Sequence, residues 1–481
     1  MSSWGNVLAV AYVAAELLVR VAMLLVVPRR RSTGAAQAWL MLILFLPWLG
    51  IILYFLIGSP KLPAHRRARQ RTVDRMLKQI VARAEADPEL APLFDVQLSE
   101  RHRQIAALTQ RLGGMPPVGC SNAVLLPDYD LAVGRIIADV DRAQREVHVL
   151  FYIFADDTVG MGLANALIRA AGRGVKVRVL IDAMGSRSLG LRRVLGLLRE
   201  GGVDACVALP ISLRDYSRID LRNHRKIVVV DGEVGYTGSQ NMVCADFKPG
   251  IVYKELMVRL TGPIVAQLQA TFMIDWYSET ELRLDDVPVL PQEVASQGSV
   301  VAQVLPSGPA YDSDNVPLLF SALLHAARER AVLVTPYFIP DEALLGAIES
   351  AAYRGVDVHL VVSKAADQFA VSRAQRSYYD ELLEAGVTIH LYDPPNLLHA
   401  KHLSIDDDMA VIGSSNVDIR SFRLDLEISV VFYGPYVAGA LRAVEERYFA
   451  SSQRLRAEEW RRRPVRQQMV ENTLRLMSPL L

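Results

Sequence analysis

Two segments of the chain carry the same polar residues at the same spacing. Residues 223–241 read NHRKIVVVDGEVGYTGSQN, and residues 398–416 read LHAKHLSIDDDMAVIGSSN. In both, a histidine is followed by a lysine after two residues, an aspartate after seven and an asparagine after seventeen. The repeated residues are His224, Lys226, Asp231, Ser239 and Asn241 in the first segment, and His399, Lys401, Asp406, Ser414 and Asn416 in the second. A lone histidine on a strand usually has a structural role, but two copies with matched spacing favour a catalytic role.

These residue types suit reactions at phosphorus. A histidine and a lysine two residues apart on an extended strand point to one face of that strand. A neutral imidazole can attack phosphorus, while the ammonium and the asparagine amide hold the phosphate oxygens. Such a site needs no metal or other cofactor, because lysines and asparagines supply the stabilising charge. We therefore predict phosphoryl transfer, and the alternative is a duplicated pair of structural strands.

The elements around both segments repeat as well. The apolar run Val147–Phe154 is followed by a helical stretch, Arg-Gly-Val at 173–175 and the run VKVRVLID. The same order returns as AVLVTPYFIP, a helical stretch, Arg-Gly-Val at 354–356 and VDVHLVVS. This alternation predicts an α/β fold with two related halves, residues 118–295 and 296–460, each with a largely parallel sheet covered on both faces.

The N-terminal sixty residues are expected to enter a membrane. One apolar stretch, from Gly5 to Val27, is interrupted only by Glu16 and Arg20, and a second runs from Ala35 to Ile57 without charge. Each is long enough to cross a bilayer, which takes ~20 residues. Residues 1–60 are therefore predicted to form a transmembrane hairpin of two helices. A cleaved signal peptide is disfavoured, because no lysine or arginine precedes Arg20.

The charges beside the hairpin predict its orientation. Three arginines fill the loop between the two apolar stretches, whereas seven lysines and arginines follow the second stretch before residue 79. Positive charge favours the cytoplasm, so we expect a multi-pass protein whose long C-terminal portion is cytoplasmic. Pro47 and Gly50 allow the alternative that the second stretch dips into the membrane and returns.

Two further segments flank the halves. Residues 61–117 are charged and helical in pattern and are predicted to form a basic linker. Residues 461–481 could form a basic amphipathic helix on an anionic membrane surface, or an ordinary packed terminal helix. The residues concerned are Arg461, Arg462, Arg463 and Arg466, followed by Val470, Leu474 and Met477.

Composition excludes several classes of protein. The 481 residues have a net charge of +1, so no global basic field indicates nucleic-acid binding. The three cysteines lie far apart, which argues against a disulfide framework or a zinc knuckle. A hydrophobic content of 51% excludes wholesale disorder.

The paired segments resemble the signature of the phospholipase D superfamily, and within it the chain is most similar to bacterial cardiolipin synthases. The similarity covers nearly the whole chain and includes NHRKIVVVDG, Ser307–Pro309, TPYFIPDE at Thr335–Glu342 and NVDIRSFRL at Asn416–Leu424. The chain departs from the family pattern in three places, one of which is GSQN at residues 238–241 in place of the glycine-richer GGSN of many relatives. Asp425 stands where an amide is expected, and the stretch Val243–Glu255 lacks the usual Trp-Arg-Asp, which makes it our candidate for lining the mouth of the pocket.

The resemblance implies two α-β-α sandwich halves whose motifs share one active site. His224 is expected to attack phosphorus and form a phosphohistidine, and His399 to act as acid and base. Glu255 and Glu427 resemble the family's second carboxylates, and we expect each to orient the histidine of the opposite half. The implied catalytic set is His224, Lys226, Asp231, His399, Lys401 and Asp406, supported at the phosphate by Ser239, Asn241, Ser414 and Asn416.

The motif aspartates form a special case. Asp231 and Asp406 each follow their own histidine by seven residues, which spans ~23 Å along an extended strand. Neither aspartate therefore needs to contact that histidine.

The same resemblance implies a cardiolipin synthase bound to the bacterial inner membrane. Such an enzyme moves a phosphatidyl group from one phosphatidylglycerol to another and releases glycerol, so its partners are phospholipids and the membrane. Alternatives are a hydrolytic phospholipase D, a phosphatidyltransferase with a different donor or acceptor, a nuclease and an inactive membrane scaffold. The N-terminal hairpin and the near-zero net charge weigh against a nucleic-acid partner, and the intact motifs weigh against a scaffold.

Overall fold

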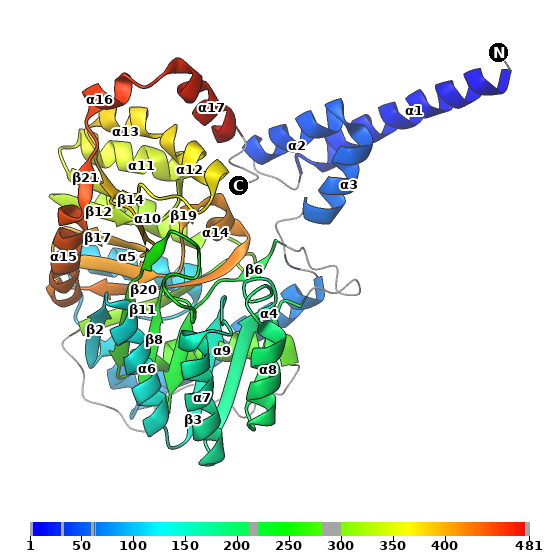
Figure 1. The fold of residues 1–481 in the computed structure, drawn as a ribbon. Helices are drawn as coiled ribbons and strands as arrows, with labels where there is room; N and C mark the ends of the chain where they lie inside the picture. The colour runs from blue at the N-terminus through cyan, green and yellow to red at the C-terminus, as the bar shows by residue number, and fades with distance from the viewer. Residues whose placement is uncertain are drawn as a thin grey trace.

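A computed structural model shows two α/β halves packed together, with three N-terminal helices projecting from one side (Figure 1). The structure describes residues 3–29, 33–58, 62, 64–210, 220–280 and 300–476. Some of the sequence predictions fall on residues outside these ranges. They are the loop arginines Arg30 and Arg31, the linker residue Lys61, the terminal Met477 and the boundary between halves at 295 and 296.

The first half is built on a seven-stranded sheet in the order β2-β10-β8-β7-β3-β4-β5. Its strands are β2 (Asn122–Leu126), β3 (Glu146–Phe151), β4 (Lys176–Asp182), β5 (Asp204–Ala208), β7 (Ile227–Val230), β8 (Val234–Gly238) and β10 (Met257–Thr261). Only β3, β4 and β5 pair in parallel, and the other neighbours are antiparallel. The sheet is thus mixed rather than largely parallel, because β7 and β8 are joined by a turn too short for a crossover helix.

The second half repeats this plan in a larger sheet, ordered β1-β11-β20-β18-β17-β12-β14-β15-β21. Its strands are β1 (Val118–Cys120), β11 (Val300–Ser307), β12 (Arg330–Val334), β14 (Asp357–Ser363), β15 (Thr388–Tyr392), β17 (His402–Ile405), β18 (Met409–Gly413), β20 (Asp425–Tyr433) and β21 (Ser452–Arg454). Again the parallel part is β12, β14 and β15. Strand β1 belongs to the first half by sequence, yet it pairs with β11 of the second.

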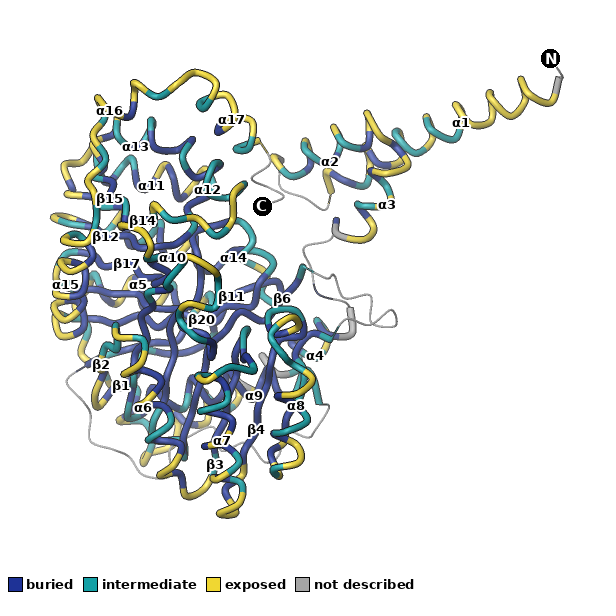
Figure 2. The backbone as a smooth tube through the Cα atoms, viewed as in Figure 1, coloured by how far each residue is buried: buried dark blue, intermediate teal, exposed yellow. Residues whose placement is uncertain are grey.

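Each sheet lies between two layers of helices, which gives the expected α-β-α sandwich. Outside the first sheet lie α6 (Tyr129–Arg142), α7 (Thr158–Gly172) and α8 (Leu191–Glu200), and outside the second lie α10 (Asn315–Ala326), α11 (Glu342–Tyr353), α12 (Phe369–Arg376) and α13 (Tyr379–Ala385). Between the sheets, α9 (Ile264–Thr280) and α15 (Pro435–Ala450) join one hydrophobic core that draws on both halves. Figure 2 shows this interior as almost continuously buried.

The predicted linker contains two helices with different roles. Helix α4 (Ala64–Ala86) contacts α9, and Arg66 forms an ion pair of 2.7 Å with Glu279 at the end of α9. Helix α5 (Glu100–Gly113) instead buries Ile105 and Ala106 in the core of the second half. The segment after residue 100 is therefore part of a half and not a linker, because its amphipathic face completes that core.

The C-terminal segment packs against the second half. Helices α16 (Ala457–Arg461) and α17 (Val465–Arg475) follow β21, and α17 contacts α12. Arg463 donates to Asp380 and Glu471, and Leu474 packs against the core of the second half. Within the described residues this segment fits the packed terminal helix better than the membrane-surface helix.

The second N-terminal apolar stretch is two helices instead of one. Helix α1 (Ser3–Val26) is followed by α2 (Thr33–Phe45) and α3 (Pro47–Ile57). Proline lacks an N–H and its ring clashes with the preceding turn, so the helix breaks at Pro47. Gly50 then allows α3 to fold against α2, since a Cβ at this position would lie 2.8 Å from the Cα of Ile43. The N-terminal unit thus differs from the predicted two-helix hairpin.

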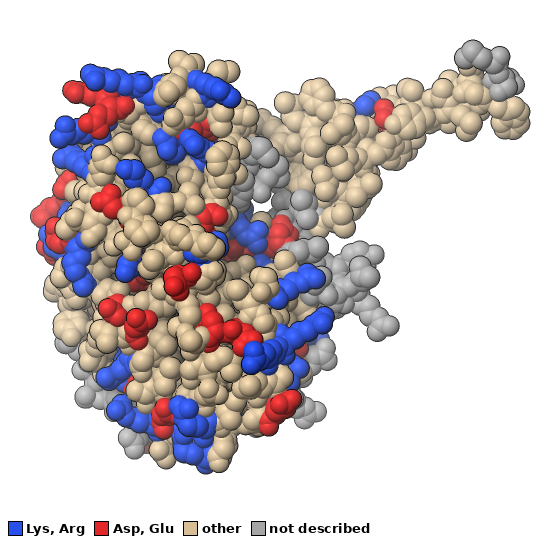
Figure 3. All heavy atoms as spheres, viewed as in Figure 1, with Lys and Arg blue, Asp and Glu red and all other residues tan. Residues whose placement is uncertain are grey.

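The N-terminal helices present an apolar surface. Trp4–Val26 is long and apolar enough to cross a membrane, whereas α2 and α3 are shorter apolar helices. Glu16 and Arg20 form the expected pair at 3.2 Å. Figure 3 shows almost no other charge on the visible face of these helices, while charges of both signs are scattered over the two halves. This surface fits a membrane environment.

The remaining elements are short. They are η1 (Ala91–Leu93), β6 (Arg222–Asn223), β9 (Val252–Lys254), β13 (Phe338–Ile339), β16 (Asn396–Leu398), β19 (Val417–Asp418) and α14 (Ile419–Arg423). Five of them, β6, β9, β16, β19 and α14, lie next to the paired motifs.

Candidate active site

The two halves exchange short strands beside the paired motifs. Strand β6, which precedes His224, pairs in parallel with β20 of the second half. Strand β16, which precedes His399, pairs in parallel with β9 of the first half. The backbone N–H of His224 donates to the Leu426 carbonyl at 2.9 Å, and that of His399 donates to the Lys254 carbonyl at 2.6 Å. Each histidine is therefore fixed by the strand of the opposite half that contains its glutamate partner, Glu427 in β20, or directly precedes it, Glu255 after β9.

This exchange places each carboxylate on the histidine of the other half, as expected from the sequence. The Nδ1 atom of His224 lies 2.9 Å from Oε1 and 3.1 Å from Oε2 of Glu427. The Nδ1 atom of His399 lies 2.7 Å from Oε1 of Glu255. Because the carboxylates accept the Nδ1–H, the Nε2 atoms are left with their lone pairs for chemistry. Both histidines line one pocket of about 490 Å³.

The motif lysines are buried beside these histidines. Lys226 donates to the carbonyl of His224 at 2.5 Å, and Lys401 donates to that of His399. The His-x-Lys residues of both motifs, 224–226 and 399–401, lie in the extended link just before β7 and β17, not within the strands themselves. The link brings each lysine back onto its own histidine, so two ammonium groups and two imidazoles are concentrated at the junction of the halves.

Burial controls the protonation of this cluster. Burial, followed by the charges of Lys226 and Lys401, holds the pKa of His224 well below its usual range. Burial also lowers the pKa of His399, although the Glu255 carboxylate opposes it. Burial lowers the pKa of Lys226 to about 8 and that of Lys401 to about 7. Both imidazoles are therefore neutral at physiological pH, as a nucleophile and a general base require.

The motif aspartates lie at the far ends of β7 and β17, away from the histidines. The prediction that they belong to the catalytic set is therefore wrong. Asp231 accepts the backbone N–H groups of Gln144, Arg145 and Glu146 at 2.7 to 2.9 Å. Asp406 accepts the backbone N–H groups of residues 328–330 at 2.9 to 3.3 Å and forms an ion pair with Arg101. Both aspartates adopt positive φ, which aspartate tolerates in a tight turn. They anchor the strands and do not line the pocket.

The serines and asparagines of the motifs are not equivalent. Ser414 donates to Glu427, whereas Ser239 donates to the backbone carbonyl of Leu256 at 3.3 Å. One oxygen of Glu255 is buried and has no hydrogen-bond partner among the described residues. Asn241 accepts the Ile153 N–H through Oδ1 at 3.1 Å, which leaves its amide N–H groups for a ligand. Asn416 also lines the pocket.

Aromatic side chains complete the walls of the pocket. Tyr152 lies edge-on to His224 at 4.9 Å between ring centroids. Tyr253 and Tyr337 lie edge-on to His399 at 5.4 and 6.2 Å. Sequence reasoning missed Tyr152 and Tyr337, although they follow the corresponding strands β3 and β12 in the repeated runs LFYIF and TPYFIP. The stretch Val243–Glu255 lines the pocket with Phe247, Lys248 and Tyr253, as predicted.

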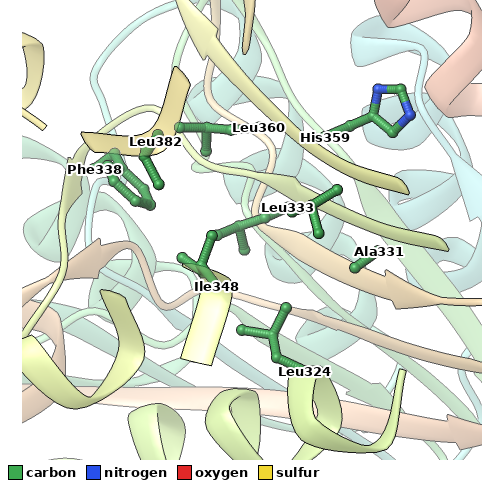
Figure 4. Close-up of a pocket in the computed structure, with 9 residues that line it drawn as sticks. Leu324, Ala331, Leu333, Phe338, Ile348, His359, Leu360 and Leu382 are labelled. Carbon is green, nitrogen blue, oxygen red and sulfur yellow. The ribbon is translucent and has the colours of Figure 1, made fainter. Parts of the chain in front are cut away.

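A second, smaller pocket lies in the core of the second half (Figure 4). Apolar side chains, among them Leu324, Leu333, Phe338 and Leu360, surround it. His359 is the lining residue with an ionisable side chain, and its Nε2 lies within hydrogen-bond distance, 2.8 Å, of Oδ2 of Asp357. This pocket holds no arrangement for chemistry, so the pocket between the halves is the candidate site.

Known proteins resemble this one in fold and in sequence. The structure of phosphatidylserine synthase from Haemophilus influenzae Rd KW20 superimposes with a TM-score of 0.60 at 16% identity, covering 80% of this chain and 100% of that one. This likeness shows that the two proteins share a fold.

Sequence comparison defines the family. The model described as "Cardiolipin synthase, PLD-like domain" matches residues 136–276 and 320–449, and a "Phospholipase D-nuclease N-terminal" model matches residues 17–59. Cardiolipin synthase A of Serratia proteamaculans is 33% identical, covering 97% of this chain and 96% of that protein. Cardiolipin synthase A of Pectobacterium atrosepticum is 34% identical with the same coverage. The chain therefore belongs to the family of phospholipase-D-like cardiolipin synthases, which are phosphatidyltransferases.

Proposed function

We propose that this protein transfers a phosphatidyl group from one phosphatidylglycerol to a second, forming cardiolipin and releasing glycerol. The observation that supports this most directly is the pairing of two His-x-Lys motifs in one pocket, each Nδ1 held by a glutamate of the opposite half. Two neutral imidazoles facing one pocket provide both a nucleophile and an acid-base group for a two-step exchange.

In the first step, Nε2 of His224 attacks phosphorus and the bond to the glycerol oxygen breaks. The negative charge of the bound donor phosphate favours the protonated form of His399, which donates its Nε2 proton to that oxygen, and glycerol leaves. In the second step, His399 removes the proton from a hydroxyl of the acceptor lipid, whose oxygen displaces His224 from phosphorus. We assign His399 as the acid-base group because the Glu255 carboxylate favours its protonated form, and His224 is then the nucleophile. Lys226, Lys401, Asn241 and Asn416 hold the phosphate oxygens.

We also propose that the N-terminal helices hold the catalytic halves at a bacterial membrane, on its cytoplasmic side. The apolar helix Trp4–Val26 and the basic helix α4 that follows the N-terminal unit support this placement. Attachment to the membrane raises the local concentration of phospholipid at the pocket, which favours a lipid substrate over a nucleic acid.

Product analysis in phosphatidylglycerol vesicles tests the proposed reaction. Cardiolipin and glycerol should form in equal amounts with little phosphatidic acid, and added glycerol should convert cardiolipin back to phosphatidylglycerol. Water is present at ~55 M, so this outcome requires the acceptor hydroxyl to be held in near-attack geometry, where effective molarities reach ~10⁵ M or more. Phosphatidic acid as the main product, without cardiolipin at any lipid concentration, would identify a hydrolase instead.

A further inference from the structure

The pocket continues beyond the two histidines toward two different ends. At one end, Tyr253 and Tyr337 flank His399, and at the other, Tyr152 flanks His224. Among the described residues that line the pocket, the lysine and arginine side chains are Lys248 at the His399 end and Arg420 at the His224 end. Each stands seven residues before the glutamate of its own half, so the duplication has placed one cation at either end.

Lys248 is held at the His399 end by a shared carboxylate. Its Nζ lies 2.7 Å from Oδ2 of Asp367, which also accepts the hydroxyls of Tyr253 and Tyr337 at 2.9 Å. The Lys248 side chain is 40% exposed, while that of Asp367 is only 3% exposed. An ammonium group has three N–H donors, and the two tyrosine hydroxyls already occupy much of the hydrogen-bonding capacity of the Asp367 carboxylate. Lys248 can therefore keep its contact with Asp367 and also bind an anion in the pocket.

The N-terminus of helix α12 adds positive potential at the same end. Gln368 is the N-cap residue of this helix and has no side-chain cap, and both Gln368 and Val371 line the pocket. The first N–H groups of a helix lack partners within the helix and favour an anion. Lys248 and this turn thus face the pocket from the two halves, one from each.

The chemistry of the transfer decides which end receives the acceptor lipid. In an in-line displacement, the leaving and attacking oxygens lie opposite the nucleophile. If His224 is the nucleophile, both oxygens lie beside His399. An acceptor phosphatidylglycerol carries its own phosphate three carbons from the attacking hydroxyl, whereas water or a simple alcohol carries no charge. The motif lysines are occupied by the phosphate that reacts, so the second phosphate requires another cation.

We propose that Lys248 and the N-terminal turn of α12 bind the phosphate of the acceptor phospholipid and so select an anionic acceptor. This inference rests on the proposed function. Arg420 at the other end is paired with Asp425 at 3.2 Å and has no acceptor phosphate to bind.

A competition between two acceptors tests this proposal. Wild-type protein in detergent is given labelled phosphatidylglycerol together with 1-butanol, and the ratio of cardiolipin to phosphatidylbutanol is measured. Both products form from the same phosphohistidine, so the ratio is independent of how fast that intermediate forms. Lys248→Gln should lower the ratio about tenfold or more, the effect of losing a charged hydrogen bond. Lys248→Arg should largely preserve it, and so should Lys176→Gln, which removes an exposed lysine at the start of β4.

The outcomes separate this proposal from the proposed function. Absence of cardiolipin with the wild-type protein would overturn the proposed function and this inference with it. An unchanged ratio in Lys248→Gln, or an equal loss of both products, would overturn this inference alone. A selective drop in Arg420→Gln, with none in Lys248→Gln, would place the acceptor phosphate at the His224 end and would also contradict it.

Discussion

His224 and His399 are related by the duplication, yet their surroundings differ. The carboxylate of Glu427 contacts His224 through both oxygens and also accepts from Ser414, whereas Glu255 contacts His399 through one oxygen. Glu427 is held by Ser414 and contacts Nδ1 of His224 through both oxygens, so it fixes the orientation of this ring, which suits a nucleophile. The Glu255 carboxylate favours the protonated, charged form of His399, which suits the acid.

This difference predicts distinct behaviour of the two alanine variants. His224→Ala and His399→Ala should each lower turnover by at least ~10²-fold, the usual contribution of an acid-base group. Only His399→Ala should retain label from acyl-labelled donor lipid on the protein, because the phosphatidyl group attached to His224 then lacks the base that activates the acceptor. His325→Ala, which changes an exposed histidine, serves as the control. Label held by His224→Ala but not by His399→Ala would reverse the two roles.

The buried lysines predict the pH dependence. A lysine with a lowered pKa loses its charge as pH rises through the lowered value, here about 7 for Lys401 and about 8 for Lys226. The value of kcat/KM should therefore fall above about pH 7 on a soluble short-chain donor, since it reports the free enzyme. The corresponding fall in kcat should occur at higher pH, because a bound phosphate stabilises the ammonium forms of the two lysines. A kcat/KM that stays level up to pH 10 would contradict this role of the lysines.

At the scale of elements, the motif is anchored to the inner helix layer by a buried ion pair. Arg225 lies between His224 and Lys226, and its Nη1 is 2.6 Å from Asp275 of α9. Its Nε also donates to the carbonyl of Glu427 at 2.9 Å. One side chain thus connects the first motif, the inner helix and the strand of the opposite half.

Removing one partner of this pair should destabilise the protein. Asp275→Ala leaves an unpaired buried guanidinium, which typically costs ~3–5 kcal/mol. The melting temperature in detergent should fall, together with activity. Asp141→Ala, which breaks the exposed pair with Arg169 on the outer helices, should leave the melting temperature nearly unchanged. Equal melting temperatures for the two variants would show that the buried pair does not support the junction.

At the scale of the whole molecule, the N-terminal helices and the catalytic halves have separate cores. Helices α1 to α3 pack around Trp39, Ile43 and Tyr54 and share no residue with the cores of the halves. The connection to the halves begins at Leu62, which is buried with Leu209 and other leucines. A cut before Leu62 therefore leaves the catalytic core intact.

Removal of residues 1–59 should separate attachment from catalysis. The shortened protein should retain most activity on detergent-solubilised phosphatidylglycerol and lose most of it on vesicles, because the helices only concentrate the enzyme at its substrate. The full chain measured in both assays provides the reference. Equal losses in the two assays would show that the helices also form part of the lipid entry path.

The spacing of residues in the sequence was enough by itself to predict the type of chemistry and the internal duplication of this protein. His224, Lys226 and Asn241, repeated at His399, Lys401 and Asn416, required only short-range pattern to be recognised. The alternation of apolar runs with helical stretches predicted the α/β halves, because strand and helix periodicities are local properties of the chain. The choice of Glu255 and Glu427 came from their resemblance to family carboxylates.

Only the tertiary structure decided how distant segments meet. His224 and Glu427 are 203 residues apart in sequence, and they touch because β6 and β20 pair across the two halves. The same packing assigns β1 and α5 to the second half and sets Asp367 between Lys248 and two tyrosines. Asp231 and Asp406 share the motif, yet the length of an extended strand carries them away from the site. Local pattern fixes which side chains a segment offers, but packing between segments far apart in the chain fixes which of them share a pocket.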